Sequence, residues 1–367
     1  MGDGTGIPQT AEEITPHWLT RALRAGGSLG DARVSAVRVD ALSEGVGFVG
    51  QVLRVTPSYD GAVDDAPRSL IAKMPSPDAG AREIAALYGL YEREYQFYRQ
   101  LAGEVSFRTP RCLYSAGDAE AVNYVLLLED LAPSGRIGDQ VAGCSVDDAL
   151  TAVRALAVHH AQWWQHELLD RSPWLGVGIE LVRGAMEQAY GASWERFLEL
   201  FGTCFSQDVR DVIPTLDQAI LKTLDELSDG PFTIAHGDYR ADNLFFGHPG
   251  SGYDVAVIDW QSPNKAWGAY DLAYFICGSF SAELRHKHEA ALRDAYFSTL
   301  LERGVRGYGR AQFDLDYARS LLVYLAIFVV NGATLDPAND RGLALFRLIF
   351  ERLNGSIGDA RALSYLP

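Results

Sequence analysis

The segment 236–243, which reads His-Gly-Asp-Tyr-Arg-Ala-Asp-Asn, constrains the fold and chemistry of this chain more than any other stretch. Asp238 follows a glycine on what we expect to be a tight loop, and Asn243 comes five residues later (243 minus 238). Asp259 ends the next apolar run. An aspartate on such a loop can accept the proton of a hydroxyl, and the other two side chains offer the hard oxygen ligands that Mg²⁺ requires. The spacing therefore predicts a site for phosphoryl transfer.

A glycine-rich segment lies upstream, where Gly45, Gly47 and Gly50 fall between two alternating apolar runs, 34–39 and 51–55. This pattern predicts a strand, a glycine turn and a second strand, whose backbone can lie against phosphates without obstruction by side chains. A dinucleotide-binding fingerprint shares the glycine spacing, but it needs a helix to begin at the third glycine. The alternation after Gly50 favours a strand. A hairpin with a purely structural role remains the alternative.

A lysine and a glutamate of complementary charge follow the glycine segment. Lys73 ends a short apolar run that predicts a strand, and such a lysine can pair with nucleotide phosphates if a carboxylate holds it. The run 84–101 has helical periodicity, and Glu94 lies beside its apolar stripe, where it can reach inward. We therefore expect Glu94 to hold Lys73. The rival carboxylates, which rank below it, are Glu83 and Glu92.

Taken in order, these parts are similar to those of protein kinases, whose catalytic loop has the same spacing between Asp and Asn. Gly237, however, stands where protein kinases have arginine, and Trp260 follows Asp259. With the Tyr-Arg after Asp238, these residues resemble the aminoglycoside phosphotransferase and choline kinase-like superfamily, most closely its ecdysteroid-kinase-like branch and bacterial relatives. Members of this superfamily phosphorylate hydroxyl groups of small molecules. The resemblance runs roughly from residue 43 to residue 350.

The resemblance implies an α+β fold of two lobes, as in protein kinases, with a small antiparallel-sheet N-lobe and a mostly helical C-lobe. Before the N-lobe we expect a helical segment. The expected boundaries are 1–30 for that segment, 31–128 for the nucleotide-binding N-lobe, 129–135 for the hinge, and 136–367 for the C-lobe with the catalytic loop and the substrate pocket.

The apolar run 124–128 breaks into polar residues and then a proline, which the resemblance identifies as the hinge between the lobes. There the carbonyl of Glu129 and the amide of Leu131 would bind the edge of the adenine. An ordinary core strand followed by a turn is the alternative.

The resemblance also implies a role for each remaining site residue. Lys73, held by Glu94, would orient the α- and β-phosphates of ATP, and Asn243 and Asp259 would hold Mg²⁺. The amides of the glycine segment would close over the γ-phosphate, while Asp238 orients and deprotonates the acceptor hydroxyl. GTP as the donor is not excluded. Asp271 resembles a family position that braces the catalytic loop.

Two features separate this chain from protein kinases. Residues 172–230 carry a further helical pattern where protein kinases have only a short connection, and such an insertion can wall off a small substrate. After Asp259 the chain has neither a long activation segment nor an Ala-Pro-Glu motif. Both features favour a small-molecule acceptor.

Composition agrees with a two-lobed enzyme. The 367 residues suffice for two domains, and 48% hydrophobic with 22% charged residues is ordinary for a globular protein. The net charge of -16 opposes binding to nucleic acid or anionic membranes. A negative net charge suits a cationic substrate, although an excess of acidic residues also commonly keeps a protein soluble.

Nothing in the sequence indicates export or membrane insertion. The N-terminus lacks the basic and apolar regions of a secretory signal, and no apolar run is long enough to span a membrane. The four cysteines have no paired metal-ligand spacing. We therefore expect a cytoplasmic protein.

Three hypotheses follow. The leading one is an ATP-dependent kinase that acts on a hydroxyl of a small molecule: an aminoglycoside or other antibiotic, a sugar, a sterol or a hydroxyacyl metabolite. A pseudokinase that binds nucleotide or metabolite is the second, and the retained polar residues argue against it. A protein kinase is the third. The sequence does not separate antibiotic resistance from a catabolic or biosynthetic role, and it does not predict the oligomeric state.

Overall fold

The computed structural model describes residues 6–42, 50–61, 66–118 and 122–367. The chain forms two compact units. The first comprises residues 1–136 together with 256–262, and the second comprises residues 137–255 and 263–367. The short segment 256–262 thus belongs to the first unit although its sequence neighbours belong to the second. Two of the glycines assigned to phosphate binding, Gly45 and Gly47, lie outside the described residues.

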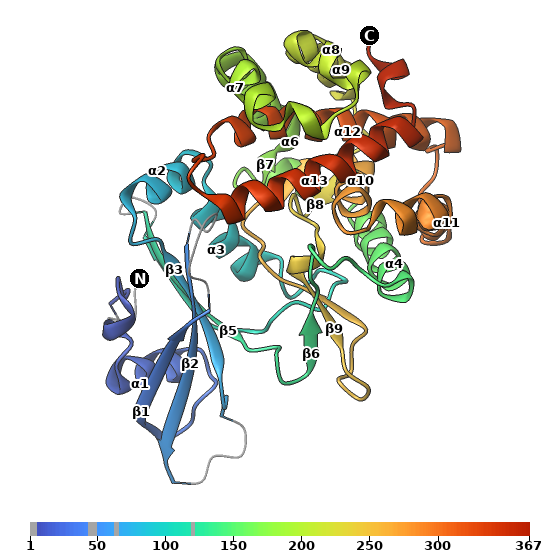
Figure 1. Cartoon of the computed structure of the whole chain (residues 1–367). Coiled ribbons are helices and arrows are strands. Elements are labelled where there is room, and N and C mark those ends of the chain that lie inside the picture. The colour runs from blue at the N-terminus through green and yellow to red at the C-terminus, as the bar shows by residue number, and fades with distance from the viewer. Residues whose placement is uncertain (1–5, 43–49, 62–65, 119–121) are drawn as a thin grey trace. The chain divides into compact units, whose positions relative to one another are not determined.

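The first unit is built on a five-stranded antiparallel sheet of order β1-β2-β3-β5-β4 (Figure 1). Strand β2 alternates buried and partly exposed residues, so that one of its faces is buried, whereas β5 is buried along almost its whole length. The strands are β1 (Arg33–Ala41), β2 (Gly50–Asp60), β3 (Leu70–Pro75), β4 (Cys112–Asp118) and β5 (Asn123–Glu129). Because Gly50 begins a strand and not a helix, the dinucleotide-binding alternative is excluded.

Helices pack on this sheet. The 3₁₀ turn η1 (Ala11–Glu13) precedes α1 (Pro16–Ala25), and Leu19 and Leu23 of α1 are fully buried in a core shared with the sheet. Two further helices, α2 (Ala79–Leu87) and α3 (Leu90–Gln100), follow β3, and α3 contacts β4 and β5.

The prediction of a single helix over residues 84–101 is wrong, because the structure has two helices there, α2 and α3. The structure breaks it at Gly89, which has φ 62° and therefore lies in the left-handed region. A residue in that conformation cannot continue an α-helix, and glycine adopts it without steric cost. The periodicity continues across the break, which is why the sequence did not show it.

The second unit is mostly helical and also holds short strands. The elements from residue 135 onward are, in chain order, β6 (Gly135–Ile137), α4 (Val146–Gln162), α5 (Leu168–Arg171), β7 (Gly176–Val177), α6 (Gly178–Ala185), the π-helical turn η2 (Met186–Tyr190), α7 (Gly191–Phe201), α8 (Gln207–Val212), α9 (Leu216–Leu227), β8 (Thr233–Ala235), β9 (Leu244–Gly247), β10 (Val255–Val257), β11 (Asn264–Ala266), α10 (Ala269–Gly278), α11 (Ala282–Glu302), α12 (Arg310–Ala333) and α13 (Asp340–Asp359). All of them belong to the second unit except β6 and β10, which have most of their residues in the first. The short strands form two sheets, of order β10-β9-β6 and β7-β11-β8.

The core of the second unit centres on α10, whose ten residues are all buried. Helix α12 packs beside it, and the Trp267 indole before α10 donates a hydrogen bond of 2.7 Å to Ser320 Oγ on α12. A small antiparallel-sheet unit and a mostly helical unit confirm the predicted α+β kinase-like fold class. Among the described helices, none is both long enough and apolar enough to cross a membrane.

Candidate active site

In the first unit, Lys73 lies between two carboxylates. Its ammonium Nζ is 2.5 Å from Glu94 Oε1 and 2.6 Å from Asp259 Oδ1. Strand β3 supplies the lysine, α3 supplies Glu94, and the segment 256–262 supplies Asp259. The structure therefore brings together three residues that are far apart in the sequence, and it pairs Lys73 with Glu94 and not with Glu83 or Glu92.

Local contacts hold Asp259 in place. Val257 donates a backbone hydrogen bond of 2.8 Å to the Arg108 carbonyl, which ties the segment into the first unit. Asp259 itself has φ 64°, a left-handed conformation that aspartate tolerates better than most residues. Trp260, the next residue, is fully buried, with its ring stacked on Phe97 of α3. The backbone conformation and the stacking together direct the Asp259 carboxylate toward Lys73.

Burial and neighbouring charges shift the pKa values of this cluster. Burial raises the pKa of Glu94 to about 7, although the charge of Lys73 lowers it in part. Burial alone would lower the pKa of Lys73, but the charges of Asp259 and Glu94 outweigh that effect and raise it. Lys73 is therefore a permanent cation at physiological pH, whereas Glu94 titrates near neutrality.

The predicted hinge residues also lie in the first unit. Glu129 ends β5, and its side chain accepts hydrogen bonds of 2.6 and 2.7 Å from Arg108 Nη2. Leu131 lies just beyond the strand and is buried, with its carbonyl accepting from the amides of Ser134 and Gly135. Gly50, the one glycine of the predicted phosphate loop among the described residues, begins β2. Their roles toward a nucleotide remain predictions.

The second unit holds the segment 236–243 as a loop between β8 and β9. Gly237 has φ 84°, so the tight turn before Asp238 requires glycine. The Asn243 amide Nδ2 donates two hydrogen bonds of 2.9 Å, one to the backbone carbonyl and one to the carboxylate Oδ2 of Asp238. The predicted base and the predicted metal ligand are thus in contact.

Arg240 is a residue of this loop to which the sequence assigned no role. Its Nε donates a hydrogen bond of 3.2 Å to Asp238 Oδ2, and its Nη1 lies 2.6 Å from Asp242 Oδ2. Gln140 fixes the arginine further by accepting from Nη1 at 3.0 Å. The hydrogen bonds from Arg240 and Asn243 to the Asp238 side chain therefore end on the same oxygen, Oδ2. The Tyr274 side chain forms a further hydrogen bond with this carboxylate.

A buried polar network braces the loop from behind. The Asp271 carboxylate on α10 accepts hydrogen bonds of 2.6 Å from the His236 amide and 3.0 Å from the Gly237 amide. His160 of α4 lies 3.3 Å from the same carboxylate and 2.6 Å from the Tyr296 hydroxyl on α11. Asp271 and His160 are fully buried, so this network positions the backbone and does not face a substrate.

Tyr274, on the turn of α10 after Asp271, is the other residue that sequence reasoning left without a role. Burial, and then the negative charge of Asp238, raise the pKa of its hydroxyl well above the usual value. Its ring stacks on Tyr324 of α12, with centroids 4.6 Å apart. Tyr274 therefore presents a neutral hydroxyl close to the Asp238 carboxylate. Aromatic residues in a helix are usually core, so the pattern gave no signal for it.

Residues 44–305 of this chain match the model of the ecdysteroid kinase-like family. The match spans more than two thirds of the sequence, including the segments that carry Lys73, Glu94, Asp238, Asn243 and Asp259. The chain belongs to the ecdysteroid kinase-like family. This confirms the superfamily expected from the motifs, and membership of the ecdysteroid kinase-like family indicates a small-molecule kinase. None of the curated protein sequences compared with it matches the chain.

Solved structures of small-molecule kinases share the fold of this ecdysteroid kinase-like protein. An ethanolamine kinase from Plasmodium vivax has a TM-score of 0.54 at 11% identity, covering 89% of this chain and 83% of that one. An amicoumacin kinase in complex with AMP-PNP, Ca²⁺ and Ami has a TM-score of 0.52 at 14% identity, covering 85% of this chain and 87% of that one. The GDP complex of an aminoglycoside 2'-phosphotransferase has a TM-score of 0.51 at 15% identity, covering 94% and 99%. At these identities the similarity establishes the fold.

Proposed function

We propose that this protein transfers the γ-phosphate of ATP to a hydroxyl of a small molecule in a Mg²⁺-dependent reaction. The observation that carries the proposal is the placement of Lys73 between Glu94 and Asp259, at 2.5 and 2.6 Å. A partly buried lysine held by two carboxylates is a cation in a fixed position, which suits the binding of nucleotide phosphates. We assign nucleotide binding to residues 31–128 and to the hinge 129–135.

The two side chains assigned to Mg²⁺, Asn243 and Asp259, each carry an oxygen of the type that the ion prefers. Because Asn243 Nδ2 donates to Asp238, the amide is fixed with its carbonyl oxygen Oδ1 turned away, and no hydrogen bond to that oxygen occurs within the described parts of the chain. Asp259 offers a carboxylate. One or two protein oxygens of this kind are typical of Mg²⁺ that is otherwise bound by phosphates and water. When bound, the ion would neutralise charge on the phosphates.

Asp238 is the residue that would receive the proton of the acceptor. Arg240 and Asn243 hold its Oδ2, and Tyr274 also hydrogen-bonds the carboxylate, so the group is fixed in one position from which it can orient a substrate hydroxyl. Because the transition state of phosphoryl transfer is loose, most of the acceleration comes from alignment and charge neutralisation. Asp238 therefore acts mainly by orienting the nucleophile.

The pseudokinase alternative is disfavoured by the same contacts. A chain that only binds a metabolite has no need for Lys73, Glu94 and Asp259 to form an ion-paired cluster, or for Arg240 and Asn243 to fix Asp238. The acceptor is proposed as a hydroxylated small molecule, among which antibiotics, aminoalcohols, sugars, sterols and hydroxyacyl metabolites are candidates. GTP is the alternative donor.

The test is nucleotide consumption with Mg²⁺ against a panel of those acceptor classes, using the wild type, Asp238→Asn and Asp229→Asn. Asp229 is an exposed residue outside the catalytic loop, so it controls for the loss of one carboxylate. We expect turnover that depends on an acceptor, loss of it in Asp238→Asn, and unchanged turnover in Asp229→Asn. Nucleotide binding without turnover toward any member would favour the pseudokinase. Full turnover in Asp238→Asn would refute the role given to Asp238.

A further inference from the structure

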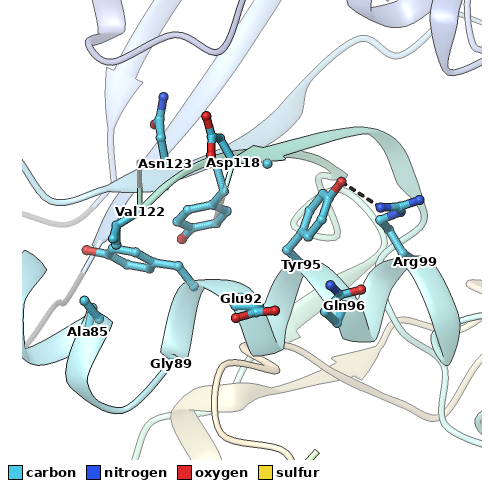
Figure 2. A pocket seen from close by; sticks show the side chains of 13 residues that line it. Ala85, Gly89, Glu92, Tyr95, Gln96, Arg99, Asp118, Val122 and Asn123 are labelled. Atoms are coloured by element: carbon cyan, nitrogen blue, oxygen red, sulfur yellow. Dashed lines mark hydrogen bonds between the residues drawn. The ribbon is translucent and has the colours of Figure 1, made fainter. Parts of the chain in front are cut away.

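The first unit contains a cavity that none of the proposed catalytic residues lines. It has a volume of about 280 Å³ and lies between the end of α2, one side of α3, and strands β4 and β5 (Figure 2). Figure 2 shows Glu92, Gln96 and Arg99 on α3, with Asp118 and Asn123 on the strands opposite. Glu94, which holds Lys73, belongs to the same helix but does not line the cavity.

Tyrosine rings form much of the wall. Tyr91 and Tyr124 stack on each other, with ring centroids 4.8 Å apart and planes inclined by 29°. The Tyr95 ring packs on Gly117, where an added Cβ would lie 3.2 Å from the ring. Glycine at that position therefore keeps β4 close to α3, and the cavity has rigid aromatic sides.

The lining contains more acidic than basic side chains. Glu92 and Asp118 are carboxylates, whereas Arg99 is the one cationic residue of the lining. Arg99 is already engaged, since its Nη1 donates a hydrogen bond of 3.0 Å to the Tyr95 hydroxyl and its guanidinium lies 5.2 Å from the centre of that ring. Glu92 forms no ion pair with any residue in the described ranges, and it is exposed to solvent. The lining therefore has two carboxylates against one guanidinium, and Arg93, the next residue on α3, interacts with the charge of Glu92 from outside the lining.

We propose that this cavity binds a small organic cation, an ammonium group carrying an apolar body of about the size of one ring. Arg99 and Gly117 already cover the Tyr95 ring, so the stacked rings of Tyr91 and Tyr124 are the ones that would attract the cation through their π-electrons. The Glu92 carboxylate would accept hydrogen bonds from the ammonium. The Gln96 and Asn123 amides add polar contacts. The net charge of -16 on the protein raises the local concentration of any cation. An anion of the same shape would be repelled.

The cavity is connected to the Lys73 cluster through the same elements. The Tyr91 hydroxyl accepts a hydrogen bond of 3.1 Å from the Ser76 amide, just after β3, the strand that carries Lys73. The Tyr124 hydroxyl lies 3.5 Å from where a Cβ on Gly50 would be, at the start of β2. A cation bound between α3 and β5 thus stabilises α3 in the position from which Glu94 reaches Lys73. On the proposed function, it would strengthen nucleotide binding, and nucleotide would strengthen cation binding by the same factor.

The binding site is tested by titrating phenethylammonium, and 3-phenylpropionate as its anionic counterpart, into the full-length protein by calorimetry. The variants are Glu92→Gln, which removes the carboxylate, and Ala86→Phe, which fills the cavity from an exposed position on α2. Glu83→Gln, an exposed glutamate of α2 outside the lining, is the matched control. Circular dichroism and thermal unfolding confirm that each variant is folded.

We expect saturable binding of the ammonium and none of the anion. Glu92→Gln and Ala86→Phe should each weaken binding by at least about fivefold, and Glu83→Gln should leave it unchanged. Absence of saturable ammonium binding would overturn the proposal. Equal binding of the ammonium by the wild type and both cavity variants would also overturn it. The same holds if binding is lost in Asp238→Asn but kept in Glu92→Gln, because the cation would then occupy the acceptor site.

Coupling is tested by measuring nucleotide affinity with and without saturating phenethylammonium. A tightening of about fivefold or more that disappears in Glu92→Gln supports the link through α3. Unchanged nucleotide affinity would overturn the coupling. Because both measurements are of binding, a chain without catalytic turnover would still give a decisive answer on the cavity, and failure of the proposed phosphotransfer is detected separately by the acceptor panel.

Discussion

The indole of Trp260 lies flat on the ring of Phe97, with centroids 4.0 Å apart and planes inclined by 5°. Trp260 follows Asp259 directly, and Phe97 lies three residues after Glu94 on α3 (97 minus 94). The stack therefore joins the two segments whose carboxylates flank Lys73. It explains why a tryptophan follows the predicted metal ligand: the residue is a structural link and does not contact phosphates itself.

Replacing Trp260 by alanine should both destabilise the protein and reduce turnover. The ring is fully buried, and loss of a buried aromatic side chain costs about 3–5 kcal/mol. Urea unfolding measures the loss, and nucleotide titration measures the effect on the Lys73 cluster. Trp260→Phe, which keeps a ring on Phe97, should recover most of both. If Trp260→Ala bound nucleotide as tightly as the wild type, the stack would not position Asp259.

Lys73→Met should weaken nucleotide binding by about tenfold or more, since a charge-assisted hydrogen bond contributes about 1.5–3 kcal/mol. The side chain of methionine has a similar length but no charge, and the Glu94 carboxylate loses its cation. Calorimetric titration of ATP with Mg²⁺ provides the measurement. Lys222→Met, at an exposed position of α9, is the matched control and should bind as the wild type does. Equal loss in both variants would point to a general charge effect.

The raised pKa of Glu94 predicts how its contribution to stability depends on pH. Because burial raises the pKa from 4.5 to about 7, the folded chain binds this proton more tightly than the unfolded chain. The contribution is therefore complete below pH 4.5 and is lost as the pH rises through about 7. The free energy of unfolding of the wild type, minus that of Glu94→Gln, should fall across this window.

Urea unfolding at a series of pH values gives that difference. Glu92→Gln, two positions earlier on the exposed side of α3, controls for the removal of one carboxylate and should show no such fall. A difference between wild type and Glu94→Gln that is independent of pH would mean that Glu94 keeps an ordinary pKa in the folded chain.

Asp271→Asn should loosen the catalytic loop without changing the shape of α10. The two carboxylate oxygens accept from the amides of His236 and Gly237, and asparagine replaces one acceptor by a donor. One buried amide then loses its partner, which costs about 1–3 kcal/mol. Hydrogen exchange of residues 236–243 should become faster, and kcat should fall more than KM rises. Unchanged exchange in this loop would contradict the bracing role of Asp271.

The sequence predicted those parts of the site that depend on order and spacing. Lys73, Glu94 and Asp259 could be proposed as a cluster because each ends or lines an element of recognisable pattern. The contact between Arg240 and Asp238 could not be predicted from the sequence. These residues are two positions apart, and whether their side chains meet depends on the path of the loop, which the left-handed conformation of Gly237 sets. The cavity beside α3 also escaped prediction, because it arises where two helices and two strands meet.

The change in stability caused by Gly89→Ala distinguishes one continuous helix over residues 84–101 from two helices, α2 and α3, separated at Gly89. The two arrangements predict changes of opposite sign. In a continuous helix, as the periodicity predicts, Gly89→Ala would stabilise the protein by about 1 kcal/mol. With φ 62°, alanine must instead adopt a left-handed conformation, which costs about 1–2 kcal/mol. We therefore expect Gly89→Ala to destabilise the protein in urea unfolding, and Gly89→Asn to do so less, because asparagine tolerates this conformation.

Gly184→Ala serves as the control. Gly184 lies inside α6, no atom is closer than 4.0 Å to the added Cβ, and the substitution should therefore stabilise the protein. Stabilisation by both alanine variants would show that α2 and α3 form one helix in solution.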